Sequence, residues 1–358
     1  MHRVDTIIFF ISNYEGGVYR YTVNHATHLC HLGYNVKIFC YAKDNLVNLD
    51  FHEKIVVLKI ELRKNYLLQL FKNLQFNLVK TSFVCAEASE LELLYELKLD
   101  SQISFVLHGD YAYYTNTALK YIGFIDSVVC VSKTILNKLN KNPLIFNKRR
   151  LKYVPHKLDP FKTSKSIKKR NKSISFVGRP THEKGFHIII DLINKLDALQ
   201  IFYSWHFYGF DKPDFVVLED FSSKLIFHGY LQHEELLEKL SESQFLILPS
   251  VFEGLPISIL EAFTLSVIPI CSRFNDEVDS LINNGKNGFI SISNDVNDYI
   301  KILQFLYNNE INVVNNDEIL IEFYEATIEP AVQQSFVTYY NKNFRSRLNR
   351  IYNLLTNE

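Results

Sequence analysis

The sequence predicts an α/β protein of two Rossmann-like domains with parallel sheets, and three observations lead to this prediction. Short, fully apolar runs such as "TIIFFIS" (6–12) alternate with amphipathic helical stretches, which is the pattern of parallel sheets. The pattern breaks at the basic, proline-containing segment 148–172 and then starts again. The length of 358 residues suits two domains, each large enough for its own core.

The first domain is predicted to cover residues 1–160, and segment 148–172 is interpreted as the connection between the domains plus a solvated charged face. Apolar runs bounded by glycine and polar residues predict the strands, and Gly33 is the expected stop of the first helix. In chain order we expect a strand at 6–12, a turn at 13–17, a helix over 18–33 and strands at 34–41, 83–86, 103–109 and 127–132.

The second domain is predicted to cover residues 161–339. The amphipathic C-terminal helix, about 340–358, is expected to pack back on the first domain. Since ligands of open α/β sheets bind beyond the carboxyl ends of the strands, we expect the site in a cleft where the two sheets face each other. The expected strands of this domain are 173–178, 205–209, 224–229, 245–250, 267–272 and 288–293.

The charges divide between the two halves of the chain. Residues 1–172 hold 26 Lys and Arg against 14 Asp and Glu, while the other half is equally acidic, so that the net charge is zero. Different partners for the two domains would explain this, and so would mutual attraction. The five scattered cysteines form no C-x-x-C pair, and the N-terminal apolar run is too short to span a membrane. We therefore expect a cytoplasmic protein with no zinc site and no nucleic-acid partner.

Two loops carry the candidate chemistry. In "FVGRPTHEKG" (176–185), Arg179 and Lys184 suit a diphosphate, although basic loop residues are more often only solvated. In "PSVFEGLPISILEAF" (249–263), Glu253 and Glu261 stand eight residues apart, which is about 12 Å if the span is helical. These carboxylates are either a cap and a surface residue or acceptors for the hydroxyls of one long ligand.

Together these motifs resemble the retaining glycosyltransferases of family 4, which have the GT-B fold. The resemblance is carried by G-R-x(4)-K-G at 178–185, by E-G-x-P opening the E-x(7)-E spacing, and by "NGKNGF" at 284–289. In the first domain "EGG", "HGD" (108–110), "VVCVS" and "VPHKLD" follow in the expected order. The chain departs from the family at His156-Lys157, where Asn-Gly is usual, and at Ser266, where Gly is usual.

The resemblance implies a role for each matched residue. Arg179 and Lys184 would hold the donor diphosphate, Glu261 the ribose hydroxyls, and Glu253 the transferred sugar. The sugar hydroxyls would then be the partners that the two carboxylates otherwise lack. The implied catalytic residues are Glu253, Arg179, Lys184 and His108, and the implied donor-binding residues are Gly16, Gly17, Arg179, Lys184, Glu253, Gly254, Leu255, Pro256 and Glu261.

The implied reaction transfers a sugar from a nucleotide-diphosphate sugar, expected to be UDP-linked, to an acceptor hydroxyl with retention of configuration. The expected role is in the synthesis of surface polysaccharide, lipopolysaccharide or a related glycan. No D-x-D occurs, so we expect neither a metal nor another cofactor. The basic, aromatic segment 59–80 predicts contact with an anionic inner membrane surface and a lipid-linked acceptor, unless its apolar residues only pack on the sheet. Two alternatives are an epimerase of the same fold and a non-catalytic nucleotide-sugar-binding partner.

Overall fold

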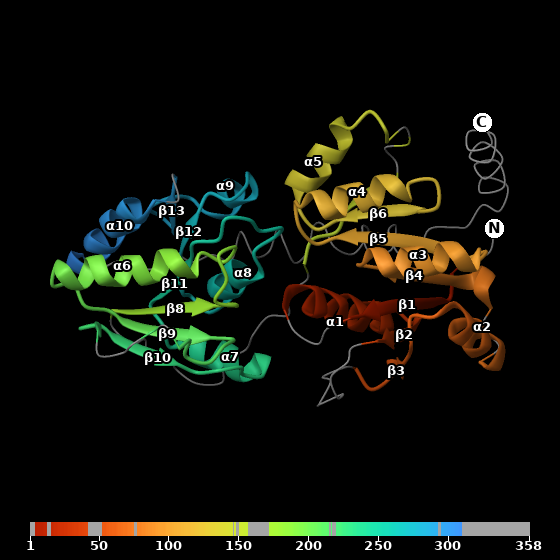
Figure 1. Cartoon of the computed structure of the whole chain (residues 1–358), viewed down its shortest axis with the longest axis horizontal. Helices are drawn as coiled ribbons and strands as arrows, with labels where there is room; N and C mark the ends of the chain where they lie inside the picture. The colour runs from red at the N-terminus through yellow and green to blue at the C-terminus, as the bar shows by residue number, and fades with distance from the viewer. Residues whose placement is uncertain are drawn as a thin grey trace. The chain divides into compact units, whose positions relative to one another are not determined.

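The chain forms two compact units, one within Met1–Lys157 and the other within Leu158–Tyr324 (Figure 1). Each is a parallel sheet with helices on its faces. The predicted boundary at residue 160 and the C-terminal helix at about 340–358 lie outside the described residues. The computed structural model describes residues 4–12, 16–41, 52–74, 77–145, 147, 150–156, 172–214, 216, 220–292 and 295–309.

The N-terminal sheet has seven parallel strands in the order β3-β2-β1-β4-β5-β6-β7. Its strands are β1 (Thr6–Ile11), β2 (Asn35–Cys40), β3 (Val56–Lys59), β4 (Thr81–Cys85), β5 (Gln102–Leu107), β6 (Ser127–Cys130) and β7 (Leu151–Tyr153). Its helices are α1 (Gly16–His31), α2 (Lys64–Asn73), α3 (Ala88–Leu97), α4 (Ala112–Lys120) and α5 (Lys133–Lys141), with a short 3-10 turn at Leu78–Lys80. The central strands β1, β4 and β5 are almost wholly buried, which is why each of them contains an unbroken run of apolar residues.

Both edges of this sheet differ from the prediction. β3 was not expected, and β7 lies within segment 148–172, so the interpretation of that whole segment as a connection and charged face is wrong for Leu151–Tyr153. Both are edge strands of three or four residues, and each contains a lysine among apolar residues, so neither has the apolar run of a central strand. The first helix also begins two residues earlier than expected, at Gly16.

The C-terminal sheet has six parallel strands in the order β10-β9-β8-β11-β12-β13, and all six were predicted. Its strands are β8 (Ser173–Val177), β9 (Ser204–Tyr208), β10 (Lys224–Phe227), β11 (Phe245–Leu248), β12 (Ile268–Ser272) and β13 (Phe289–Ser291). Its helices are α6 (Phe186–Ala198), α7 (His233–Ser241), α8 (Ile257–Thr264), α9 (Glu277–Leu281) and α10 (Val296–Asn308).

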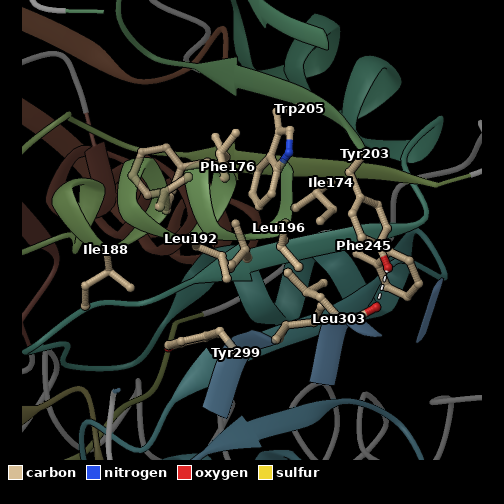
Figure 2. Close-up of a cluster of buried hydrophobic side chains, with 14 of the residues drawn as sticks. Ile174, Phe176, Ile188, Leu192, Leu196, Tyr203, Trp205, Phe245, Tyr299 and Leu303 are labelled. Atoms are coloured by element: carbon tan, nitrogen blue, oxygen red, sulfur yellow. Dashed lines mark hydrogen bonds between the residues drawn. The ribbon is translucent and has the colours of Figure 1, made fainter. Parts of the chain in front are cut away.

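Alternation along the strands divides the core of this domain between the two faces of the sheet. On one face Phe245 and Ile247 of β11 pack with residues of α6 and α10, while Leu246 faces α7 and α8 on the other. Figure 2 shows the first of these clusters, in which the Tyr203 hydroxyl donates to the Leu303 carbonyl oxygen over 2.8 Å. This packed sheet provides the rigid base from which the loops at its carboxyl edge project.

Candidate functional site

Two loops meet at the carboxyl edge of the C-terminal sheet. One follows β8 and runs through Gly178 to Gly185, and the other follows β11 and leads into α8. The Val251 N–H donates to the Glu183 carbonyl oxygen over 2.8 Å. At Gly185, where φ is +71°, an added Cβ would lie 2.1 Å from the Pro249 carbonyl oxygen. Only glycine fits there, because the backbones approach so closely.

The predicted cation and carboxylate of these loops form an ion pair. Lys184 Nζ lies 2.5 Å from Oε1 of Glu253, and the Ser250 hydroxyl donates to the same oxygen over 2.7 Å. The two charged side chains are 28% and 13% exposed, so the pair is largely shielded from water. Arg179 is exposed, and its side chain makes no ion pair within the described part of the chain. The structure thus brings Lys184 and Glu253 together and leaves the Arg179 guanidinium open to solvent.

Glu261 lies in α8 and is only 8% exposed. Its Oε1 lies 2.7 Å from Nε2 of His233, the first residue of α7. Glu253 precedes α8, so the helical distance of about 12 Å does not apply to the pair of carboxylates. Pro256 is the N-cap residue and its carbonyl oxygen accepts the first helical hydrogen bonds, from Ile259 and Leu260.

Both carboxylates therefore have partners within the protein, contrary to the expectation that a ligand must supply them. Glu253 has Lys184 and Ser250, and Glu261 has His233. This follows from the cost of burying a carboxylate, which is high unless the charge is paired or hydrogen-bonded. The motif predicted the two carboxylates, but no pattern in the sequence pointed to His233.

A second unpredicted residue, Asn275, holds the turn that contains Glu253. Its side-chain Nδ2 donates to the carbonyl oxygens of Glu253 and Gly254, each over 3.0 Å. Its Oδ1 accepts the N–H of Glu277 over 3.0 Å, at the start of α9. Asn275 follows β12, so three neighbouring strands of the sheet, β8, β11 and β12, each contribute a residue to this turn.

Ser266 adopts the left-handed conformation, with φ of 54°, one residue beyond Leu265, the C-cap of α8. The Ser266 N–H donates to the Phe263 carbonyl oxygen and the Val267 N–H to that of Ala262, over 3.1 and 2.8 Å. This is the Schellman arrangement, which favours glycine at the left-handed position. Ser266, where the family usually has glycine, is therefore an L-residue in a backbone conformation that favours glycine.

In the N-terminal domain, His108 follows β5 and belongs to a cluster of rings. The Tyr21 ring lies 4.2, 4.9 and 5.7 Å from the rings of His25, His108 and His156. Burial and, to a lesser degree, His156 lower the pKa of His108 to about 3. The imidazole is therefore neutral at physiological pH, and it can donate or accept a single hydrogen bond at a sugar but cannot act as a cation.

The other two predicted residues of this domain are Gly16 and Gly17, the first residues of α1. Gly16 has φ of +83°, and apart from its chain neighbours and the backbone of its own helix, no described residue lies within 4 Å of where its Cβ would be. The positive φ and the open space at the helix N-terminus permit the close approach of an anion. These two residues and His108 lie in the unit within Met1–Lys157, and the remaining predicted residues lie in the other.

A buried carboxylate that sequence reasoning missed fixes the turn after β4. Glu90 is 1% exposed, and its carboxylate accepts the Tyr41 hydroxyl over 2.6 Å and the Ala86 and Glu87 N–H groups over 2.7 and 3.0 Å. Burial raises the pKa of Glu90 to about 7, in spite of these hydrogen bonds. A titratable group therefore sits at the carboxyl edge of the N-terminal sheet.

A cavity of about 430 Å³ lies beside α9 in the C-terminal domain, lined by the Arg273–Asp279 ion pair, by 282–284 and by β13. None of the predicted site residues lines it.

Among the described residues no group of three or more His, Cys, Asp and Glu side chains could hold a metal ion. No helix of the described ranges is both long and apolar enough to cross a bilayer.

Comparison with known proteins finds a family match for the segment that contains Lys184, Glu253 and Glu261. Residues 159–323 match the family described as "Glycosyl transferases group 1". A Salmonella typhimurium protein, WcaL, whose name assigns it provisionally as a colanic acid biosynthesis glycosyltransferase, is 24% identical over 33% of this chain and 32% of its own length. The uncharacterized glycosyltransferase MJ1178 of Methanocaldococcus jannaschii is 25% identical over 60% of this chain and 61% of its own length. The chain thus spans about a third and three fifths of these relatives.

Solved structures are similar over nearly the whole chain. An S. aureus TarM mutant in complex with Fondaparinux, alpha-GlcNAc-glycerol and UDP has a TM-score of 0.72 at 10% identity, covering 99% of this chain and 100% of that one. Anabaena Alr3699/HepE in complex with UDP and glucose has a TM-score of 0.66 at 14% identity, covering 92% and 97%. The GT-B prediction of two parallel-sheet α/β domains is confirmed.

Proposed function

We propose that the chain is a retaining glycosyltransferase of family 4 that transfers a sugar from a UDP-linked donor to an acceptor hydroxyl. The carrying observation is the Lys184–Glu253 ion pair, which joins two loops at the carboxyl edge of the sheet, within the segment that matches group 1 glycosyl transferases. The choice of UDP as the nucleotide of the donor is supported by its presence in the similar TarM and HepE structures. The proposed pathway is synthesis of a surface polysaccharide, a lipopolysaccharide or a related glycan.

The proposed roles follow from charge and position. Lys184 and the exposed Arg179 would neutralise the diphosphate, and the N–H groups of the turn before α8 would donate to its oxygens. Glu261, already oriented by His233, would accept hydrogen bonds from the ribose hydroxyls. Glu253 would accept hydrogen bonds from the hydroxyls of the transferred sugar, and Lys184 would turn to the phosphate. Each residue would then exchange its partner in the ion pair for a group of the donor.

The reaction in this proposal is a front-face substitution without a protein nucleophile. The bond between the anomeric carbon and the diphosphate oxygen breaks, and the acceptor oxygen bonds to the same face of that carbon. The leaving diphosphate takes the acceptor's proton. Lys184, Arg179 and the amides at the start of α8 stabilise the negative charge that grows on the leaving oxygen. Neutral His108 would position a sugar hydroxyl and would not deliver a proton as a cation.

Helix α2 supports the proposal of contact with an anionic membrane. Leu67 and Phe71 are buried against the sheet, as the alternative interpretation required, with Phe71 and Phe39 rings stacked at 6.2 Å. Yet Tyr66, Leu68 and Leu74 remain 36%, 44% and 47% exposed. Lys64 and Lys72 of the same helix are also exposed, and this combination of apolar and basic groups suits anionic headgroups and a lipid-linked acceptor.

One experiment tests the reaction class. The purified protein is first screened for nucleotide sugars that raise its melting temperature, since a ligand at 100 times its Kd adds about 2.7 kcal/mol. The selected donor is then incubated with glycan and lipid-linked acceptors in EDTA, and the anomeric configuration of the product is read by NMR. The proposal expects retention without added metal. An inverted product, epimerised donor in the absence of acceptor, or activity that needs manganese would each contradict it.

A further inference from the structure

The turn between β11 and α8 is held at several points, and Asn275 holds the part nearest to α8. The Ser272 hydroxyl donates to the Ser250 carbonyl oxygen, and the Val251 N–H donates to Glu183. Beyond these, the Asn275 amide nitrogen lies 3.0 Å from the carbonyl oxygens of both Glu253 and Gly254. One side chain therefore fixes two successive peptide groups.

The direction of these two carbonyl groups determines the direction of two amides. In a planar trans peptide the N–H of the next residue points opposite to the carbonyl. The N–H groups of Gly254 and Leu255 therefore both point away from Asn275. Gly254 and Leu255 are buried, and neither N–H donates to any residue that the structure describes. Because buried backbone donors seldom lack an acceptor, both amides are available to a ligand that offers acceptor oxygens, as a diphosphate does.

We propose that Asn275 is a positioning residue that aims the Gly254 and Leu255 amides at the donor diphosphate. This inference rests on the proposed function, because it takes the donor to be a nucleotide sugar. Asn275 would not touch the donor itself. The competing interpretation is that Asn275 only caps α9 through the Glu277 N–H, in which case its effect on ligands would follow its effect on stability.

The substitution Asn275→Ser separates these two interpretations. Serine retains an oxygen that can accept the Glu277 N–H and introduces no charge, but it is too short to reach both carbonyl oxygens. The matched control is Asn287→Ser. Asn287 also uses its Nδ2 to hold a carbonyl, that of Leu281 over 3.2 Å, and its Oδ1 to accept an N–H, that of Asn283 over 2.7 Å. None of these control contacts involves the turn at 253–254.

The affinities for UDP and for uridine are measured by calorimetry on the full chain, with melting temperatures for all variants. Asn275→Ser should weaken UDP binding about tenfold, the worth of one charge-assisted hydrogen bond, and leave uridine binding unchanged. Asn287→Ser should leave the UDP-to-uridine affinity ratio at its wild-type value. Equal ratios for wild type and Asn275→Ser would overturn the positioning role while leaving the proposed function intact.

A second measurement on the wild-type protein does not depend on a folded variant. UDP, but not uridine, should slow hydrogen exchange at the Gly254 and Leu255 amides, as followed by NMR. Exchange at these amides that is unaffected by UDP would overturn the inference. Failure of the wild-type protein to bind UDP, GDP or ADP would instead overturn the proposed function, and the inference with it.

Discussion

Lys184 Nζ and Glu253 Oε1 lie 2.5 Å apart and join the loop after β8 to the loop after β11. In the proposed function, Lys184 binds the diphosphate of the donor and Glu253 binds its sugar. In the absence of a donor the Lys184 ammonium and the Glu253 carboxylate neutralise each other, so neither charge is buried without a partner. A bound nucleotide sugar would replace both partners, its phosphate pairing with Lys184 and its sugar hydroxyls with Glu253.

The two cations should respond differently to truncation. Lys184→Ala and Arg179→Ala should each lower kcat/KM about 100-fold, because each would remove charge stabilisation from the leaving group. Only Lys184→Ala should also lower the unfolding free energy, by about 1–3 kcal/mol, since it leaves the Glu253 carboxylate with the Ser250 hydroxyl but without a cation. Activity assays and urea unfolding measure the two effects.

Lys195→Ala is the control for these variants, because it removes an exposed pair with Asp191 on α6 of the same domain. Lys195→Ala should leave kcat/KM at its wild-type value and should change the unfolding free energy by no more than about 0.5 kcal/mol. Equal loss of stability in Arg179→Ala and Lys184→Ala would contradict the assignment of the ion pair.

Ser266→Gly should stabilise the protein. An L-residue in the left-handed conformation is strained relative to glycine, so the substitution should raise the unfolding free energy by about 1 kcal/mol. Ser266→Ala keeps the strain and should give no gain, which makes it the control. Chemical denaturation of the three proteins, with turnover unchanged, checks this. A destabilised Ser266→Gly protein would mean that the serine side chain makes a contribution larger than the strain.

Stability should fall as pH rises because of Glu90. The pKa of this carboxyl is about 7 in the folded protein, against an ordinary value of 4.5, so the folded state holds the proton that the unfolded state releases between these values. The stabilisation is therefore fully lost above about pH 7, and for this shift it amounts to about 3 kcal/mol.

Glu90→Gln should remove this decline in unfolding free energy between pH 5 and pH 8. Glu92→Gln, on the exposed side of the same helix α3, should retain it. Urea unfolding at several pH values measures both. A wild-type profile that rises over this range, or a Glu90→Gln profile parallel to the wild type, would show that Glu90 ionises near its ordinary pKa.

Helix α2 gives a prediction for membrane binding. The protein should sediment with anionic liposomes and not with neutral ones, and salt should release it, because each basic residue near the surface is worth about 1 kcal/mol. Lys64→Glu with Lys72→Glu should weaken binding more than about tenfold. The same double charge reversal at Lys120 and Lys141, on α4 and α5 of the same domain, is the control. Equal recovery in the supernatant under all conditions would mean that the acceptor is met in solution.

Most of the strands that the sequence predicted are largely buried, and the exception is β10, an edge strand in which no residue is fully buried. β1, β5 and β11 are buried and mostly apolar, because helices cover both faces of the sheet at its centre. The missed strands, β3 and β7, are at the edge, where a strand can be short and can carry a lysine. Their pairing is decided by the neighbouring strand and leaves little trace in local composition.

The residues of the candidate site also fall into two groups, those that the sequence predicted and those that it did not. Lys184, Glu253 and Glu261 stand in motifs of fixed spacing, so they could be selected from the sequence. His233 and Asn275 could not, because they reach their partners from 28 and 22 residues away through tertiary contacts. Their roles depend on where helix α7 begins and on where the turn after β12 points, and neither has a periodicity or motif of its own.

The measurement that tests the donor site most directly compares Glu253→Gln with Glu261→Ala. Calorimetry gives the affinity for UDP and for the selected UDP-sugar, and the transfer assay gives kcat. Glu253→Gln should bind UDP within about threefold of wild type and lose most turnover, because its loss is confined to the sugar. Glu261→Ala should weaken UDP binding about tenfold or more, because two ribose hydrogen bonds to a charged group are lost. If both variants bind UDP and turn over as the wild type does, the donor does not occupy the turn before α8.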